Sequence, residues 1–398
     1  MHARTWLSLI TLPLVAAFTY PMVVQPQPEP RKEAKTSQDP LGGISDIQDV
    51  LALVRQHYVD APDMEKVVSG GIQGALERAH PSNAYLSPED LSLPDPGSAN
   101  PGLALRKSQI YAQVIAVTPG SSAEKAGLHV GDVVRKLDGA SLGPLSAWKL
   151  ERSLLGAPGT TMELLCYDSQ SGQTRTVTVT RERPARPALA LRKEAKASVV
   201  TFSDLSQGRV QEFKNLAASL DPHLPLVLDL RRCNGGDLNE AARLAGYFFG
   251  PGPFATFQEA GKTETSLLTE GPKTSPFAKV VLLSGVGTVG PGELLVAAFR
   301  KQGAPTFGDR TAGMGFNRTR IALRQGGAVE LVNRRWTGAG GEKLDRQGVT
   351  PEHFWRGLKA DEDLLPRILD ALEQKAPPKA EDKSLHARVG RLADSEMA

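Results

Sequence analysis

Short apolar runs and amphipathic stretches alternate along the second half of the chain. The segments VVTF from Val199, PLVLDL from Pro225 and VVLL from Val280 are aliphatic or β-branched and have the length of strands. Between them, RVQEFKNLAASL from Arg209 and NEAARLAGYFF from Asn239 place apolar residues at helical spacing. This alternation predicts an α/β sheet whose strands are joined by helical crossovers.

The most informative stretch runs from Lys279 to Gly315. Its strand, Val280–Leu283, contains no polar residue, as expected for a strand buried on both faces, and a glycine-rich turn follows. Helix formers then run from Glu293 to Gln302, and Gly303 ends the helix. The apolar face of this helix contains Leu294, Leu295, Ala298 and Phe299. The turn therefore leads into a helix N-terminus, where anions are favoured.

The end of the core is predicted from two more strands and a helix. Asn317–Arg324 and Ala328–Arg335 flank Gly326-Gly327 and predict a hairpin. The final amphipathic helix contains Leu364, Leu365, Ile368, Leu369 and Leu372. We place the α/β core at residues 186–375. The charged residues 376–398 are predicted to form a disordered tail.

The segment VTPGSSAEKAGLHVGDVVRKLDG is typical of a PDZ-like domain, which we place at residues 100–185. It reads as a strand into Pro119-Gly120, a short helix ending at Ala126-Gly127, and a strand opened by Gly131-Asp132. A PDZ domain binds a peptide C-terminus through backbone N–H groups and an exposed strand edge. A purely regulatory or supporting use of the same fold is the alternative.

The peptide site of this domain is predicted at Gly102, Leu103, Ala104 and Leu105. These residues stand where PDZ domains carry the loop that accepts the terminal carboxylate. The helix around Ala147–Leu155 is expected to form a wall of the groove. Arg106 and Lys107 are expected to add a mild attraction for the carboxylate.

The N-terminal part divides into three predicted segments. Residues 1–26 begin with a short basic region, and a charge-free stretch with no clear cleavage site comes next. We therefore expect a signal peptide or signal-anchor. Residues 27–44 are Pro-rich and then charged, which predicts a linker. Residues 45–95 begin with a capping-box pattern at Ser45 and Gln48 and predict a helical region. A buried N-terminal helix is the alternative for the first segment.

Composition narrows the functional classes. The chain has 398 residues, 40% of them apolar and 23% charged, which is ordinary globular composition for two or three domains. The net charge of +3 is too small to indicate a nucleic-acid partner. The two cysteines, Cys166 and Cys233, have neither metal-ligand spacing nor the pattern of a disulfide framework. We expect no metal and no cofactor.

Several segments resemble the C-terminal processing (tail-specific) serine proteases. The strand-turn-helix of residues 280–302, the segment Gly308–Gly315, Leu228–Arg231 with Gly235-Gly236, and DRQGVTPEH all match that family's pattern. RQHYVD and HPSNAYLSPED resemble its helical N-terminal region, which often builds a dimer. The resemblance covers about Ser45–Leu372 and implies a ClpP/crotonase-like sheet with crossover helices in the core.

The same resemblance implies that the catalytic side chains are missing. With Glu293 aligned to the family glutamate, Gly290 stands at the nucleophilic serine and Met314 at the general-base lysine. Arg318 stands at the glutamine that orients the lysine. Pro291, which has no N–H, stands at one oxyanion donor. The other donor corresponds to Gly235 or Gly236, in a loop where Arg232, Cys233 and Asn234 depart from the family pattern.

Three other residues, Cys233, Ser284 and Thr288, are candidates for a substitute nucleophile. Cys233 lies beside the degenerate site, with His223 ten residues earlier across a strand, and a small buried thiol is the simpler interpretation. Ser284 ends a strand and Thr288 precedes the site by two residues, so turn roles are favoured for both.

We therefore expect a bacterial envelope or periplasmic protein, anchored in the inner membrane or secreted, that binds polypeptide C-termini or unfolded clients without cleaving them. A homodimer or a mixed assembly with an active paralogue is the expected assembly. An active serine-type endopeptidase with an unconventional site and a purely structural role are the alternatives.

Overall fold

A computed structural model describes residues 43–183, 186–269, 271, 276–358 and 362–373. The predicted signal segment 1–26, nearly all of the linker 27–44 and the tail 376–398 lie outside the described residues. Within the described ranges, no helix is both long and apolar enough to span a membrane.

The core contains a sheet of six strands in the order β17-β14-β13-β10-β9-β8. Neighbouring strands from β9 to β17 are parallel, and β8 pairs antiparallel with β9 at the edge. The strands are β8 (Ala190–Glu194), β9 (Ala197–Thr201), β10 (Leu226–Asp229), β13 (Val280–Ser284), β14 (Thr306–Gly308) and β17 (His353–Phe354). The α/β class predicted from the sequence is confirmed.

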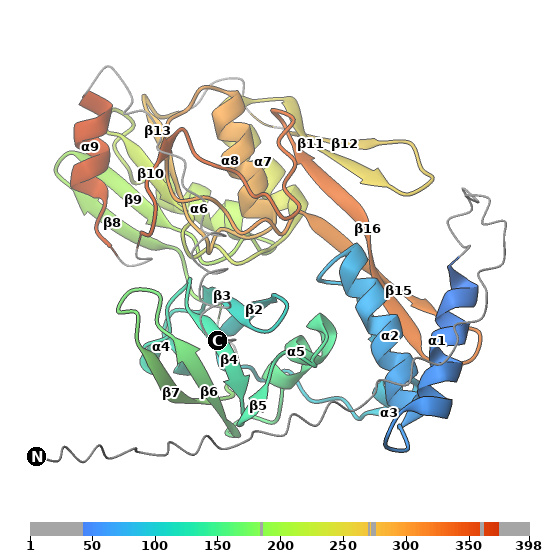
Figure 1. The fold of residues 1–398 in the computed structure, drawn as a ribbon. Coiled ribbons are helices and arrows are strands. Elements are labelled where there is room, and N and C mark those ends of the chain that lie inside the picture. Colours follow the sequence, from blue (N-terminus) through green and yellow to red (C-terminus); the bar gives the residue numbers. More distant parts are fainter. Residues whose placement is uncertain (1–42, 184–185, 270, 272–275, 359–361, 374–398) are drawn as a thin grey trace, which may run out of the picture. The chain divides into compact units, whose positions relative to one another are not determined.

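The two faces of this sheet are covered by different helices (Figure 1). One face packs with α6 (Arg209–Ala217), α7 (Leu238–Phe249) and α8 (Pro291–Lys301) in the largest apolar cluster. The other face packs against α9 (Leu365–Glu373). Adjacent residues of β13 divide accordingly: Leu282 lies in the first cluster and Val281 in the second. Burial on both sides explains why this strand has no polar position before Ser284.

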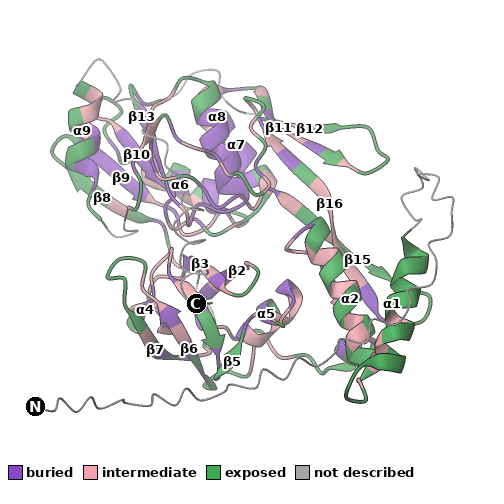
Figure 2. Ribbon diagram, in the orientation of Figure 1, coloured by how far each residue is buried: buried purple, intermediate pink, exposed green. Residues whose placement is uncertain are grey.

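Helix α8 is the most deeply buried helix of the core, and Figure 2 shows it in purple over almost its whole length. It begins at Pro291, two residues before the predicted start at Glu293. Proline is favoured at the first helical position because its missing N–H would have no partner inside the helix. The turn before α8 is thus held at the centre of the core.

A second sheet extends from the core. It contains β1 (Ala84–Leu86), β11 (Gly252–Glu259), β12 (Thr265–Thr269), β15 (Phe316–Ala322) and β16 (Ala328–Gly338). β15 and β16 form the predicted hairpin, and β16 also pairs with β1 and β11. The β15–β16 register shifts between Asn317 and Arg318, which marks a bulge near the candidate site.

Residues 99–182 form a separate sheet with its own apolar core. The strand order is β2-β3-β4-β6-β7, with β5 paired to β4, so β2 is an edge strand. The elements are β2 (Leu103–Lys107), β3 (Ala112–Val117), α4 (Ser122–Lys125), β4 (Val133–Leu137), β5 (Ala140–Ser141), α5 (Ala147–Leu154), β6 (Thr161–Tyr167) and β7 (Thr174–Thr180). We call this unit the β2–β7 domain.

The helical N-terminal region contains α1 (Ile44–His57), α2 (Met64–Ala79) and α3 (Pro88–Ser92). Helix α1 has Gly43 as its N-cap, with no side-chain cap, so the predicted cap at Ser45 is wrong. Ser45 lies inside the first turn because the helix starts one residue earlier. Neither α1 nor α2 contains a buried residue, in contrast to α8.

Candidate functional site at the start of helix α8

The carboxylate of Glu293 lies at the centre of the candidate site. Its side chain is fully buried in the first turn of α8. Oε1 accepts hydrogen bonds from the backbone N–H of Gly290 at 3.0 Å and of Met314 at 2.8 Å. Oε2 accepts from the Thr311 hydroxyl at 2.5 Å and from the Gly313 N–H at 2.7 Å. One side chain therefore holds two loops together.

Burial raises the pKa of the Glu293 carboxyl, while the hydrogen bonds from Thr311, Met314, Gly313 and Gly290 act in the opposite direction. All four of these groups are donors, so each matches an ionised oxygen. Because the N–H groups of residues 290 and 314 share Oε1, the two positions predicted to carry nucleophile and base are neighbours in space.

Gly290 adopts a backbone conformation that few other residues would adopt. Its φ is +61° and its ψ is −116° at the N-cap of α8. A Cβ added here would meet the Trp336 ring at 3.8 Å and 3.9 Å, which is ordinary contact. A serine side chain therefore has room, but the positive φ would strain any residue with a Cβ. Pro291 follows as the first residue of the helix.

The predicted oxyanion loop lies beside this turn. The Val289 N–H donates to the Cys233 carbonyl at 3.0 Å, and Asn234 and Val289 form a parallel bridge. The N–H groups of Gly235 and Gly236 donate to no acceptor in the described part of the chain, although Gly235 accepts from Leu205 at 3.0 Å. The bridge to Val289 thus brings the loop of Gly235 and Gly236 next to the turn that contains Pro291.

The substitute nucleophiles are all engaged or inaccessible. The Ser284 hydroxyl donates to the Asp309 carbonyl at 3.0 Å, and the Thr288 hydroxyl donates to the Leu230 carbonyl at 2.8 Å. Both side chains are fully buried. Cys233 is fully buried as well, and burial raises the pKa of its thiol. His223 is exposed in the turn before β10. None of these groups has the geometry of an activated nucleophile.

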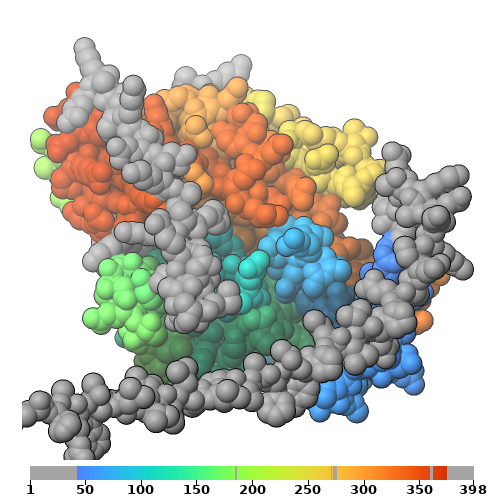
Figure 3. All heavy atoms as spheres, viewed as in Figure 1, coloured from blue at the N-terminus to red at the C-terminus, as the bar shows by residue number. Residues whose placement is uncertain are grey.

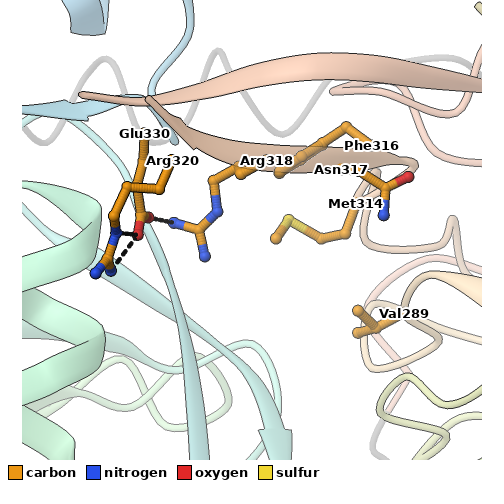
Figure 4. Close-up of a pocket in the computed structure, with 7 residues that line it drawn as sticks. All are labelled: Val289, Met314, Phe316, Asn317, Arg318, Arg320 and Glu330. Atoms are coloured by element: carbon orange, nitrogen blue, oxygen red, sulfur yellow. Dashed lines mark hydrogen bonds and ion pairs between the residues drawn. The ribbon is translucent and has the colours of Figure 1, made fainter. Parts of the chain in front are cut away.

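A cavity of about 600 Å³ opens next to Met314. It is lined by Val289, Met314, Phe316, Asn317, Arg318, Arg320 and Glu330 (Figure 4). Arg318 is paired with two carboxylates: its Nη2 lies 2.7 Å from Glu151 Oε2 on α5, and its Nη1 lies 3.6 Å from Glu330 Oε2. Asn317, on the other side of the bulge, accepts from Trp336 Nε1 at 2.8 Å.

Comparison with known proteins agrees with this arrangement. Residues 196–353 match the profile of Peptidase family S41. We call this matching part of the chain the S41 domain. A probable CtpA-like serine protease of Staphylococcus aureus (strain COL) is 24% identical over 328 residues, which are 80% of this chain and 65% of that relative. The chain thus spans just under two thirds of that relative's length.

Two further matches extend the comparison. A probable CtpA-like serine protease of Staphylococcus saprophyticus is 25% identical over 63% of this chain and 52% of its own length. A photosystem II D1 C-terminal processing protease has the same fold, with a TM-score of 0.63 and 21% identity over 77% of this chain and 86% of that structure. The resemblance to C-terminal processing proteases is therefore confirmed.

The β2–β7 domain packs directly against the site of the S41 domain. Ile115 and Ala104 form a small apolar cluster with Val289, Ala312 and Met314. In the view of Figure 3, green and teal atoms of the β2–β7 domain lie below orange atoms of the core. Farther out, Arg232 of the S41 domain pairs with Glu124 of α4. The wall of the site is thus built partly from the neighbouring domain.

Arg106 and Lys107 do not serve as predicted. Arg106 donates to the carbonyl of Ala312 and to the Gln113 side chain, and burial lowers the pKa of its guanidinium. Lys107 is buried and its Nζ donates to the Gln109 carbonyl at 2.8 Å. Neither cation is available to a peptide carboxylate, because their side chains are turned to other partners.

The described residues contain no group of His, Cys, Asp and Glu suited to hold a metal ion. A His–Asp pair beside Phe316 was not predicted from the sequence. His80 Nε2 lies 2.9 Å from Asp345 Oδ1, and His80 Nδ1 accepts from the Ser82 N–H at 3.1 Å. Both ring nitrogens are engaged, so His80 links distant segments and is not a free base. The 265-residue separation of the pair leaves no local sequence signal.

Replacing Glu293 with glutamine tests its central position. The new NH₂ group would face two donors where an oxygen now accepts both. We expect the free energy of unfolding to fall by about 3 kcal/mol, measured by urea denaturation. Glu264→Gln, at an exposed position, is the matched control. Equal stability of the two variants would show that the Glu293 contacts are not what holds the loops.

Proposed function

We propose that this protein is a catalytically silent member of the C-terminal processing protease family that binds polypeptide C-termini. The observation that carries the proposal is the shared oxygen of Glu293, which receives the N–H groups of Gly290 and Met314. These are the two positions at which the family resemblance requires a serine and a lysine. Neither side chain present has a nucleophilic oxygen or a basic nitrogen.

The other groups at the site also support the proposal that the protein does not catalyse peptide cleavage. Acyl transfer needs a nucleophile, a base within hydrogen-bonding reach and donors aimed at the developing oxyanion. Pro291 removes one of those donors, and Gly235 or Gly236 retains the other. The hydroxyls of Ser284 and Thr288 are bound to carbonyls inside the core. A donor loop without a nucleophile can orient a peptide carbonyl but cannot cleave it.

The binding role is assigned to the β2–β7 domain, which we interpret as PDZ-like. Its edge strand β2 contains the predicted carboxylate loop, and α5 packs next to β2. A peptide added to this edge would gain main-chain hydrogen bonds without any special side chain. Domain bounds of 100–185 fit the bridges that join Ala99 to Gly156 and Asn100 to Glu182.

Location and assembly extend the same proposal. The curated relatives are bacterial. We propose an envelope or periplasmic location, with membrane attachment or secretion through residues 1–26 and a homodimer or mixed assembly with an active paralogue. Unfolded clients are proposed as a second class of ligand, because their chain ends and extended segments fit a strand edge.

The first prediction is that the purified protein does not digest labelled casein. Hydrolysis should stay at the level of buffer alone, since nucleophile, base and one oxyanion donor are absent. Activity that co-purifies through a further chromatographic step and disappears in Cys233→Ser would contradict the proposal and identify the thiol as the nucleophile.

The second prediction concerns rescue. Gly290→Ser with Met314→Lys should give marginal activity, and adding Pro291→Ala should raise turnover by about a hundredfold or more, because an oxyanion N–H is restored. The positive φ of Gly290 limits both variants equally. Replacing the serine by alanine in the triple variant is the matched control. A double variant as active as the triple one would refute the position assigned to Pro291.

The third prediction is that the protein binds a short peptide ending in alanine-valine with a free carboxylate, and that amidation of this terminus weakens binding. The charge-assisted hydrogen bonds to backbone N–H groups would be lost in the amide. Calorimetry with both peptides measures the difference. Equal affinities would reduce the β2–β7 domain to a scaffold.

A further inference from the structure

The predicted carboxylate loop already contains an internal ligand, the side chain of Asn100. Its Oδ1 accepts hydrogen bonds from the N–H of Gly102 at 2.6 Å and from the N–H of Leu103 at 3.0 Å. Its Nδ2 donates to the carbonyl of Leu103 at 3.2 Å. A carboxamide thus makes the same kind of contacts that a peptide end would make with a strand edge.

Two of the three backbone groups that Asn100 occupies, the N–H and C=O of Leu103, face away from β3. The pairing of β2 with β3 uses the Gly102 carbonyl, which accepts from the Thr118 N–H at 2.8 Å. Alternate residues of a strand direct their N–H and C=O groups to opposite sides, so those of Leu103 point away from β3. The Leu103 groups satisfied by Asn100 are therefore groups that an added strand would need.

Asn100 is held in place by its own main chain. Its N–H and C=O pair with Glu182 at 3.0 Å and 3.1 Å. A Cβ on Gly102 would lie 2.1 Å from Ser121 Cβ, so the loop passes too close to α4 for any other residue. The backbone of the loop is consequently fixed, and a ligand would displace only the Asn100 side chain by rotating it.

We propose that the Asn100 carboxamide is a built-in competitor that occupies the seat of a peptide's terminal carboxylate and thereby sets the affinity of the β2–β7 domain. This inference rests on the proposed binding of C-termini. A peptide must break three hydrogen bonds of Asn100 before it forms its own. The competitor is neutral, so a carboxylate, which makes stronger charge-assisted bonds to N–H groups, can replace it. An amidated end has no such advantage.

The simpler interpretation is that Asn100 only shapes the turn. Asparagine before proline commonly bonds the backbone two residues ahead, and Pro101-Gly102 fits that pattern. That role needs the contact with Gly102. It does not need the two contacts with Leu103, which is already fixed within β2. The two interpretations differ in what removal of the side chain does to ligand binding.

Two substitutions with opposite expected effects test the proposal. Asn100→Ala removes the competitor, and we expect the peptide ending in alanine-valine to bind about tenfold more tightly in calorimetry. Asn100→Asp keeps the turn but places a charged acceptor in the predicted carboxylate-binding site. The affinity for the free peptide should therefore fall by a similar factor. The amidated peptide should respond little to either change. Asn239→Ala, at an exposed asparagine of α7, is the matched control.

The outcomes separate this inference from the proposed function. If wild type, Asn100→Ala and Asn100→Asp all bind the free peptide equally and the amidated one less well, the competitor is refuted while C-terminal binding stands. If no variant binds the free peptide, C-terminal binding by this domain is refuted and the competitor with it. Asn100→Ala removes a turn contact, so the folding of this variant is checked by thermal unfolding. If Asn100→Ala does not fold, the binding measured with Asn100→Asp decides whether the competitor is refuted.

Discussion

The geometry of the site depends on one buried carboxylate. Glu293 brings its charge into the core, and four donors from two segments converge on it. Moving a carboxylate out of water is costly unless its oxygens are fully hydrogen-bonded. The loops at 290 and 311–314 therefore have little freedom, because any departure would leave the charge unsatisfied. This requirement fixes the positions of Gly290 and Met314 whether or not they perform chemistry.

The neighbouring β2–β7 domain adds a second constraint. Its strands pack apolar side chains onto Val289, Ala312 and Met314 at the site. The ion pair between Arg318 and Glu151 also crosses the boundary, but both side chains are partly exposed, so it adds little stability. Apolar packing and the hydrogen bond from Arg106 to Ala312 therefore dominate this boundary.

The framework of the site does not depend on the side chains at positions 290 and 314. The framework is needed for stability, because Glu293, the buried helix α8 and the parallel strands form one core. At positions 290 and 314 the contacts with Glu293 come from backbone N–H groups, and glycine readily adopts the positive φ of residue 290. The site can therefore keep its shape without a serine or a lysine side chain at these positions.

Local patterns in the sequence were sufficient for much of this protein. The buried strand Val280–Ser284, helix α8 and the β15–β16 hairpin follow from periodicity and turn residues, since each is determined by neighbours along the chain. The identity of Gly290, Pro291 and Met314 was likewise visible in the sequence. The cap of α1 was predicted two residues too late, at Ser45 instead of Gly43, because capping patterns occur inside helices as well as at their ends.

Tertiary structure alone decided which distant groups meet. The contacts of Glu293 with Thr311 and Gly313, of His80 with Asp345 and of Trp336 with Asn317 join residues far apart in sequence, and no periodicity predicts them. The direction of Arg106 depended on how the β2–β7 domain packs on the S41 domain. The occupation of the carboxylate loop by Asn100 depended on side-chain geometry within a turn whose residues were already known. Sequence specified the elements and the residues at positions 290, 291 and 314, while packing specified the partners of each polar group, because those partners are set by the fold as a whole.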